Sequence, residues 1–426
     1  MSHFSFRDSV LCAERLSLAT IAASVDTPCF VYSTAAMEAQ FTGLDDALAA
    51  ALPGRNRLIA YAVKANDNLA TIATFAKLGA GADIVSEGEL RRALAADISA
   101  DKIVFAGVGK RREEIDFALS VGVGQFSVES ANELDVIESV AAERGVRGCF
   151  AIRVNPDVDP KTHAKIATGL AETKFGVPIG DAADLYARAA GSPHLDPIGI
   201  GAHIGSQLTQ LFPYESAFER LVSLARTLRA NGAPLRRIDF GGGLGVAYHH
   251  DETTPDPADY ARIVAKALGD FDCDIVFEPG RYLVANAGVM VSRVIYIKQG
   301  TDRKFLVCDA AMNDLMRPAL YDAYHHIETV IEPTDHAARD PIDIVGPVCE
   351  ATDIFARGRF MPPVAQGDLI AFYSAGAYAS VMGSQYNTRP CAPEVMVRHD
   401  EFEIIRPRPS YDEIIGRDAL PRWLSR

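Results

Sequence analysis

The 426-residue chain, with 48% hydrophobic and 23% charged residues, is long enough to bury large cores. Its net charge of −14 argues against nucleic acids and anionic membranes as partners. No apolar run approaches the roughly 20 residues of a membrane helix, and the start MSHFSFRDSV lacks a signal-peptide pattern. Seven scattered cysteines without a CxxC pair indicate neither a metal site nor a disulfide framework. We therefore expect a soluble, cytoplasmic protein.

The first two-thirds of the chain, up to about residue 282, alternates apolar runs with amphipathic stretches. A possible helix at 35–52 comes first, and later stretches such as 87–97, 131–144 and 214–230 have helical spacing. The strand candidates are 57–64, 81–86, 102–107, 124–129, 148–154, 198–204, 236–241 and 274–278. These runs are continuously apolar, which is typical of parallel strands covered by helices. Eight such units predict an α/β fold, a (β/α)8 TIM-type barrel over residues 35–282, with an open doubly wound sheet as the alternative.

Beyond residue 282 the pattern changes. Strand-like runs at 289–298, 304–310, 342–350 and 368–374 have few helical stretches between them. This predicts a mostly antiparallel β domain of residues 283–426, to which residues 1–34, including TPCFVYS at 27–33, also contribute.

Four polar or glycine-rich elements follow the ends of predicted barrel strands. Lys64 ends the first strand in YAVKAN, His203 ends the sixth, Gly241–Gly243 follow the seventh, and Glu278 follows the eighth. Taken singly, these residues have ordinary interpretations: a solvated lysine, a buried histidine, a tight turn and a turn glutamate. In a barrel, however, functional side chains collect at the carboxyl ends of the strands. Their shared position therefore indicates a functional site.

The residue types indicate the chemistry of that site. Gly241–Gly243 and Gly245 let backbone N–H groups approach an anion, and barrels bind phosphate in the loops after strands seven and eight. A phosphate site beside a strand-end lysine suggests pyridoxal 5'-phosphate (PLP), whose aldehyde forms a Schiff base with lysine. A carboxylate such as Glu278 keeps the pyridine nitrogen of PLP protonated. His203 could stack on the ring.

Motifs along nearly the whole chain resemble the fold-type III PLP-dependent decarboxylases, and within them the diaminopimelate decarboxylase branch. The segments 162–176 and 309–327 are specific to that branch, and no position that the family uses for chemistry departs from its pattern. The matching segments are YAVKAN (61–66), THAKIATGLAETKFG (162–176), HIGSQ (203–207), DFGGGLG (239–245), EPGRYLV (278–284), DAAMNDLMRPALYDAYHHI (309–327), GPVCEATDIFA (346–356) and SAGAYASVMGSQYN (374–387).

The resemblance implies decarboxylation of meso-2,6-diaminopimelate to L-lysine and CO2, the last step of lysine biosynthesis, by a homodimer with shared active sites. It implies that Lys64 and Cys349 are catalytic, Cys349 as a proton donor from the partner chain. The implied cofactor-binding residues are Lys64, His203, Ser206, Gly242, Gly243, Glu278, Gly280, Arg281 and Tyr378. The implied substrate-binding residues are Arg281, Arg317, Tyr321, Glu350 and Tyr378.

Two of these residues suit a substrate with an amino acid group at each end. The distal end needs a cation and an anion together; Arg317 could bind its carboxylate and Glu350 its ammonium. Pro318 suits a first helical turn, so we expect Arg317 at a helix cap with Tyr321 four residues on.

Three other functions remain open from the sequence. An ornithine- or arginine-type decarboxylase would not need the Arg317 clamp, and an alanine-racemase-like enzyme would be expected to carry an arginine in place of Glu278. A non-catalytic decarboxylase-like binding protein would not need both Lys64 and Cys349.

Overall fold

The computed structural model describes residues 3–159, 174–249, 251–334 and 337–424. Most of the predicted segment 162–176 therefore lies outside the described residues. The chain divides into two compact units: residues 37–247 with 251–284, and residues 1–36, 248–250 and 285–426. We call these the barrel unit and the β unit, and each is described by itself.

The barrel unit contains a closed sheet of eight parallel strands, which confirms the predicted barrel and rules out the open doubly wound sheet. In chain order the strands are β5 (Arg57–Ala62), β6 (Gly81–Ile84), β7 (Ile103–Phe105), β8 (Gln125–Val128), β9 (Gly148–Asn155), β11 (Leu195–Gly201), β12 (Arg237–Asp239) and β13 (Asp274–Phe277). The pairing Phe126↔Phe150 joins β8 to β9, and Ile275↔Arg57 joins β13 back to β5. The short β10 (Val177–Pro178) extends the sheet beside β9.

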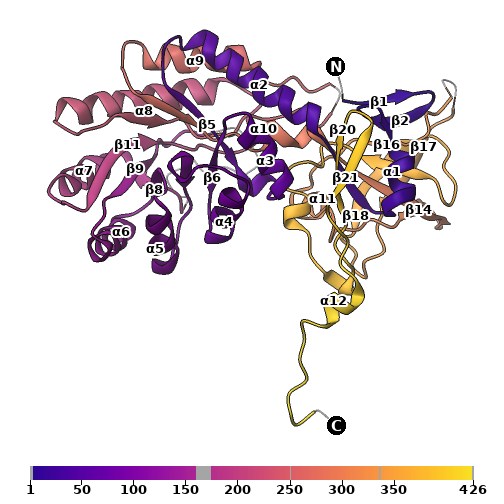
Figure 1. Ribbon diagram of the computed structural model, residues 1–426. Coiled ribbons are helices and arrows are strands. Elements are labelled where there is room, and N and C mark those ends of the chain that lie inside the picture. The colour runs from indigo at the N-terminus through magenta and orange to yellow at the C-terminus, as the bar shows by residue number, and fades with distance from the viewer. Residues whose placement is uncertain (1–2, 160–173, 250, 335–336, 425–426) are drawn as a thin grey trace. The chain divides into compact units, whose positions relative to one another are not determined.

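Helices alternate with these strands and cover the outside of the barrel (Figure 1). They are α2 (Thr34–Ala51), α3 (Leu69–Lys77), α4 (Glu87–Ala95), α5 (Arg112–Val121), α6 (Ala131–Arg144), α7 (Ala182–Ala190), α8 (Phe212–Ala230), α9 (Pro257–Leu268) and the short α10 (Arg281–Val284). Local sequence explains where they begin. Ser86 and Ser130 accept N–H bonds in the first turns of α4 and α6, which satisfies donors that a helix leaves unpaired.

The β unit is built on a mixed sheet with strand order β18-β17-β15-β14-β4-β20-β21, and β19 and β16 branch from it. The bounds are β4 (Cys29–Ser33), β14 (Gly288–Gln299), β15 (Lys304–Cys308), β16 (Ile327–Thr329), β17 (Asp340–Val345), β18 (Ile354–Met361), β19 (Leu369–Phe372), β20 (Glu394–Arg398) and β21 (Glu401–Arg406). Most pairs are antiparallel, as predicted; β15–β17 and β20–β4 are parallel. The N-terminal strand β4 lies in the middle of this sheet, between β14 and β20.

The remaining elements of the β unit lie at its two chain ends and in its loops. They are β1 (Phe4–Arg7), β2 (Val10–Ala13), β3 (Leu16–Ser17), α1 (Leu18–Val25), α11 (Arg317–Tyr321) and α12 (Tyr411–Ile415). One apolar core joins the N-terminal elements to the sheet, with Leu11, Ile21, Val31, Val291 and Val395 all fully buried. Burial of such side chains is the main stabilising term for a sheet of this kind.

Several predicted strands are too long, and one of them carries predicted site residues. Residues 342–350 were expected to form a single strand, but β17 ends at Val345. Pro347 has no N–H to continue a ladder, and the Val348 N–H donates to Asp353 Oδ2 at 2.7 Å instead. The residues after Val345, including Cys349 and Glu350, therefore lie in a loop.

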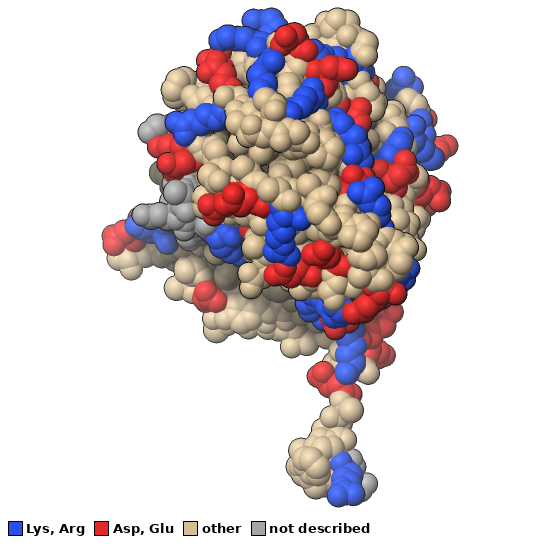
Figure 2. Space-filling model, turned by 90° about the vertical axis from the view of Figure 1, so that its left-hand side faces the viewer, with Lys and Arg blue, Asp and Glu red and all other residues tan. Residues whose placement is uncertain are grey.

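Two surface features bear on the expected partners. No helix among the described residues combines the length and the apolar character needed to cross a bilayer. On the face of the molecule drawn in Figure 2, acidic and basic side chains are interspersed.

Candidate active site

Lys64 lies just beyond the end of the first barrel strand. β5 ends at Ala62, and residues Val63–Ala65 form a single 3-10 turn, so Lys64 belongs to this turn and not to the strand itself. Its ammonium group forms an ion pair with Asp83 on the neighbouring strand β6. Asp83 is the register partner of Ala62 and is fully buried. The turn thus places the Lys64 amine against a buried carboxylate, while about one third of the Lys64 side chain is exposed.

Two further carboxyl groups lie at the ends of β12 and β13. Asp239 accepts the Gly241 N–H at 2.9 Å and the amide of Gln125 at 3.1 Å. Glu278 is almost fully buried, and its backbone N–H donates to the Gly241 carbonyl at 2.8 Å. Burial raises the pKa of Glu278 well above its ordinary value, and the negative charges of Asp239 and Asp83 raise it further. Glu278 is therefore a group that holds a proton.

His203 follows strand β11, two residues beyond its last residue Gly201. Its Nδ1 accepts the Gly242 N–H at 3.2 Å, so the ring carries its proton on Nε2 when neutral. Burial lowers the pKa of His203 well below its ordinary value, and the positive charges of Arg153 and Lys64 lower it further. The imidazole is therefore neutral at physiological pH, which suits stacking on an aromatic ring.

The glycine-rich loop after β12 packs backbone against backbone. A Cβ on Gly242 would lie 2.1 Å from the Glu278 carbonyl oxygen, so only glycine fits there. Gly243 has φ +104°, a conformation that side chains with a Cβ rarely adopt. In the same unit, the guanidinium of the buried Arg281 donates to Ser206 Oγ at 3.3 and 3.4 Å. Close backbone approach and a hydroxyl beside an arginine are features of anion sites.

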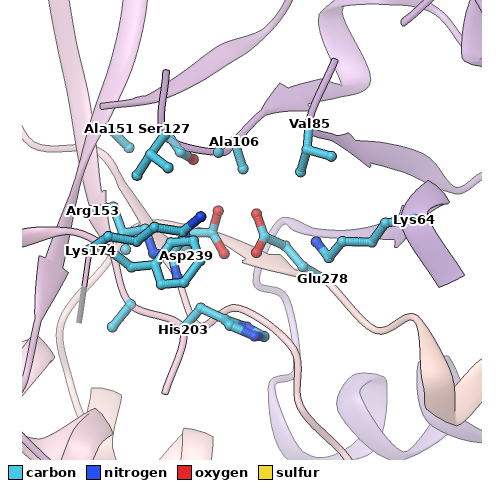
Figure 3. A pocket seen from close by; sticks show the side chains of 15 residues that line it. Lys64, Val85, Ala106, Ser127, Ala151, Arg153, Lys174, His203, Asp239 and Glu278 are labelled. Atoms are coloured by element: carbon cyan, nitrogen blue, oxygen red, sulfur yellow. The ribbon is translucent and has the colours of Figure 1, made fainter. Parts of the chain in front are cut away.

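A cavity of about 390 Å³ within the barrel unit brings these groups together. Figure 3 shows Lys64 reaching into the cavity from one side and the carboxyl groups of Glu278 and Asp239 turned towards each other. His203 lies on one side of the cavity, and small side chains including Ala106 and Ser127 lie on the other. These groups fit the parts of PLP. The Lys64 amine suits its aldehyde, and the proton-holding Glu278 suits its ring nitrogen. The neutral His203 ring suits the face of the pyridine ring, and the glycine-rich loop suits the phosphate. Among the described residues, no group of three or more potential ligands could hold a metal ion.

Several charged residues at this cavity were not predicted from the sequence. Asp239, Arg153 and Lys174 line it, and the buried Asp83 forms an ion pair with Lys64. Arg153 donates to Glu129 at 3.0 Å, and Glu129 also accepts the N–H groups of Gly107 and Gly176. A signal was available, because Asp83 and Arg153 interrupt otherwise apolar runs, GADIVS and CFAIRV, where a charge is costly unless it is paired.

The remaining predicted site residues belong to the β unit. Arg317 is buried. It is the first residue of α11 rather than its cap, which is Met316; Pro318 is then the second residue, still in the first turn, where the missing N–H costs no helical hydrogen bond. Arg317 Nη1 lies 2.8 Å from His325 Nε2, and its guanidinium stacks 4.6 Å from the centre of the Tyr248 ring. Tyr321 ends the same helix and is half-buried.

Cys349 and Glu350 lie on the exposed loop after β17. The Cys349 N–H donates to Asn387 at 2.9 Å, which anchors the loop backbone. Hydrogen bonds from the Thr352 and Tyr386 hydroxyls lower the pKa of Glu350, so this side chain is a carboxylate at neutral pH. Tyr378 has a positive φ of 53° in the loop after β19. The structure thus groups the predicted residues within each unit, eight in the barrel unit and five in the β unit.

Comparison with known proteins agrees with this architecture. Residues 35–285 match the family model described as pyridoxal-dependent decarboxylase, pyridoxal binding domain. The chain is 49% identical to diaminopimelate decarboxylase of Pseudomonas aeruginosa over 99% of both chains, and 46% identical to that of Zymomonas mobilis over 100% of both. It also resembles the crystal structure of diaminopimelate decarboxylase from Helicobacter pylori complexed with L-lysine, with a TM-score of 0.89, 40% identity, and coverage of 94% of this chain and 98% of that one. The chain belongs to the diaminopimelate decarboxylases, a family of pyridoxal-dependent decarboxylases.

Proposed function

We propose that the chain binds PLP in the barrel cavity and decarboxylates meso-2,6-diaminopimelate to L-lysine and CO2. The observation that carries this proposal is that Lys64 and Glu278, an amine and a proton-holding carboxyl, line the same cavity (Figure 3). Full-length identity of 46–49% to diaminopimelate decarboxylases supports the choice of substrate.

Cofactor binding is assigned to groups from five loops. Lys64 would hold PLP covalently, and the backbone of Gly242, Gly243 and Gly280 would approach its phosphate together with Ser206 and Arg281. Tyr378 would add its hydroxyl from the β unit. A Cβ on Gly280 would lie 3.0 Å from Ala62 Cβ, which supports a role for Gly280 in close packing beside Lys64. When bound, the cofactor supplies an electron sink for the bond that breaks at Cα.

The carboxyl of Glu278 controls the proton on the ring nitrogen in this proposal. Because burial favours its protonated form, Glu278 can donate a hydrogen bond or a proton to a pyridine nitrogen. His203 contributes an uncharged ring face, which does not compete for that proton.

Recognition of the substrate is assigned mainly to the β unit. Arg317 would bind the distal carboxylate and Glu350 the distal ammonium, with Tyr321 and Tyr378 beside them; Arg281 would contact substrate from the barrel unit. The buried guanidinium of Arg317 and the ionised Glu350 support these roles, because a zwitterion needs a cation and an anion together.

Cys349 is assigned as the proton donor to Cα after CO2 leaves. Its position on an exposed loop supports action outside its own fold unit. We propose that the functional assembly is a homodimer, in which Cys349 and Glu350 of each chain complete the site built on the other chain's Lys64.

The direct test is formation of L-lysine and CO2 from meso-diaminopimelate by the purified holoenzyme. Ornithine, arginine and alanine are measured beside it at the same concentrations. Turnover confined to meso-diaminopimelate is the expected result. Faster decarboxylation of ornithine or arginine would replace the proposed substrate, and racemisation of alanine would replace the reaction type.

A further inference from the structure

We propose that His325 is a positioning residue that holds the Arg317 guanidinium for the distal carboxylate of the substrate. This inference rests on the role of Arg317 in the proposed function. It starts from two hydrogen bonds of one imidazole: His325 Nε2 lies 2.8 Å from Arg317 Nη1, and His325 Nδ1 lies 2.8 Å from the carbonyl oxygen of Tyr373.

The chemistry of the two partners determines the protonation of His325. A carbonyl oxygen can only accept, so Nδ1 carries a proton and donates it to Tyr373. A guanidinium can only donate, so Nε2 must offer its lone pair to Arg317. Both bonds form together only in the neutral Nδ1–H form of the ring. His325 therefore donates to a backbone carbonyl through Nδ1 and accepts from a guanidinium through Nε2.

The surroundings of His325 keep it in this orientation. The side chain is 1% exposed, and the Tyr248 ring packs against it edge-on with centroids 5.5 Å apart. The same Tyr248 ring stacks on the Arg317 guanidinium. The charged or titratable groups on the surrounding elements are Arg317, Tyr248, Tyr324, His326, Glu328, Arg359 and Tyr373.

Protonation of His325 would break this arrangement. An imidazolium has no acceptor at Nε2, and its positive charge would repel the adjacent guanidinium. Arg317 would lose one of the contacts that orient it, and a bidentate carboxylate bond depends on orientation. Acidification should therefore weaken binding of ligands that carry the distal carboxylate, and should spare ligands that lack it.

Two substitutions separate the two hydrogen bonds. His325→Gln places an amide oxygen near the position of Nε2, so it keeps an acceptor for Arg317 and does not titrate. His325→Asn places its amide near Nδ1, so it keeps a donor for Tyr373 and loses the acceptor. The probes are L-lysine, which has the distal carboxylate, and 1,5-diaminopentane, which is L-lysine without it. Their dissociation constants from the holoenzyme are measured by calorimetry between pH 5.5 and 8.

We expect His325→Asn to weaken L-lysine binding by about 10- to 100-fold, the loss typical of a hydrogen bond to a charged group, and to leave 1,5-diaminopentane within about twofold. His325→Gln should bind L-lysine nearly as wild type does. In wild type the dissociation constant of L-lysine should rise relative to that of 1,5-diaminopentane on acidification. In His325→Gln this relative rise should be absent. Equal weakening of both ligands by both variants would reduce His325 to a structural role and overturn the inference.

Arg317→Ala separates this inference from the proposed function. If Arg317→Ala leaves L-lysine binding unchanged, the assignment of Arg317 to the distal carboxylate is wrong. If Arg317→Ala weakens L-lysine binding and His325→Asn does not, only the role of His325 is wrong.

Discussion

Glu278 and Asp239 are joined by a hydrogen bond between their carboxyl groups inside the barrel. Asp239 is held in place by the Gly241 N–H and the Gln125 amide, and burial raises the pKa of both carboxyls. Because the negative charge of Asp239 raises the pKa of Glu278, the proton of the pair resides on Glu278. Glu278, which lines the same cavity as Lys64, is thus the carboxyl that holds the proton.

Glu278→Gln should keep PLP bound and slow decarboxylation by about 100- to 1,000-fold, the scale for loss of one preorganised electrostatic group. The amide is close in shape and can donate to Asp239, but it cannot hold the ring nitrogen in its protonated form. Single-turnover rates and the visible absorbance of the holoenzyme check this. An unchanged rate would place the partner of the ring nitrogen elsewhere.

The same substitution should stabilise the cofactor-free protein at alkaline pH. The folded-state pKa of Glu278 is raised, so folding favours the protonated carboxyl, and the wild type loses stability as pH rises through that pKa. A glutamine has no proton to lose. The melting temperature of apo Glu278→Gln should therefore exceed that of apo wild type more at pH 9 than at pH 5. An equal difference at both pH values would mean that folding does not raise the pKa of Glu278.

Lys64→Ala should abolish turnover and the visible absorbance of covalently bound cofactor, because the amine in the turn after β5 would be gone. Lys77→Ala, at the exposed end of α3, is the matched control and should behave as wild type. Activity retained in Lys64→Ala would remove PLP catalysis at this lysine.

Gly242→Ala should abolish PLP binding and destabilise the barrel unit by several kcal/mol, because the new Cβ would lie 2.1 Å from a backbone oxygen that cannot move away freely. Gly43→Ala is its control. Gly43 lies in the interior of α2 with nothing within 4 Å of an added Cβ, so this change should stabilise by about 0.5–1 kcal/mol. Chemical denaturation of both variants checks the contrast. PLP bound normally by Gly242→Ala would remove this loop from the site.

Mixing Lys64→Ala with Cys349→Ala chains should restore activity if the active site is shared between two chains. Random reassociation gives half heterodimers, each with one intact site and one site lacking both groups. The expected activity is about a quarter of wild type per chain, counted under two-fold symmetry. Subunit exchange is verified separately by mass spectrometry of labelled chains. Confirmed exchange with activity at background would place Cys349 in the site of its own chain.

The amino-acid sequence by itself determined the eight strand-and-helix units and the positions of the principal site residues, whereas closure of the sheet into a barrel was decided by the tertiary structure. Continuous apolar runs alternating with helical stretches can bury both faces of a strand only in a parallel sheet covered by helices, so all eight strands were predicted. The carboxyl ends of parallel strands meet at one edge. Lys64, His203 and Glu278, far apart in the chain, were therefore expected together, and they line one cavity.

Tertiary structure alone decided the electrostatics and the partners of these residues. The pKa of Glu278 depends on Asp239 and Asp83, which reach it from other strands, and on burial that no local pattern measures. Strand β17 ends early because Asp353, beyond the predicted strand, accepts the Val348 N–H. The buried Arg317 contacts His325, and the Tyr373 carbonyl determines which nitrogen of that histidine carries the proton. Tyr373 lies 48 residues beyond His325 in the chain. Such contacts arise from packing in three dimensions, because hydrogen-bond partners and desolvation depend on neighbours in space and not on neighbours in sequence.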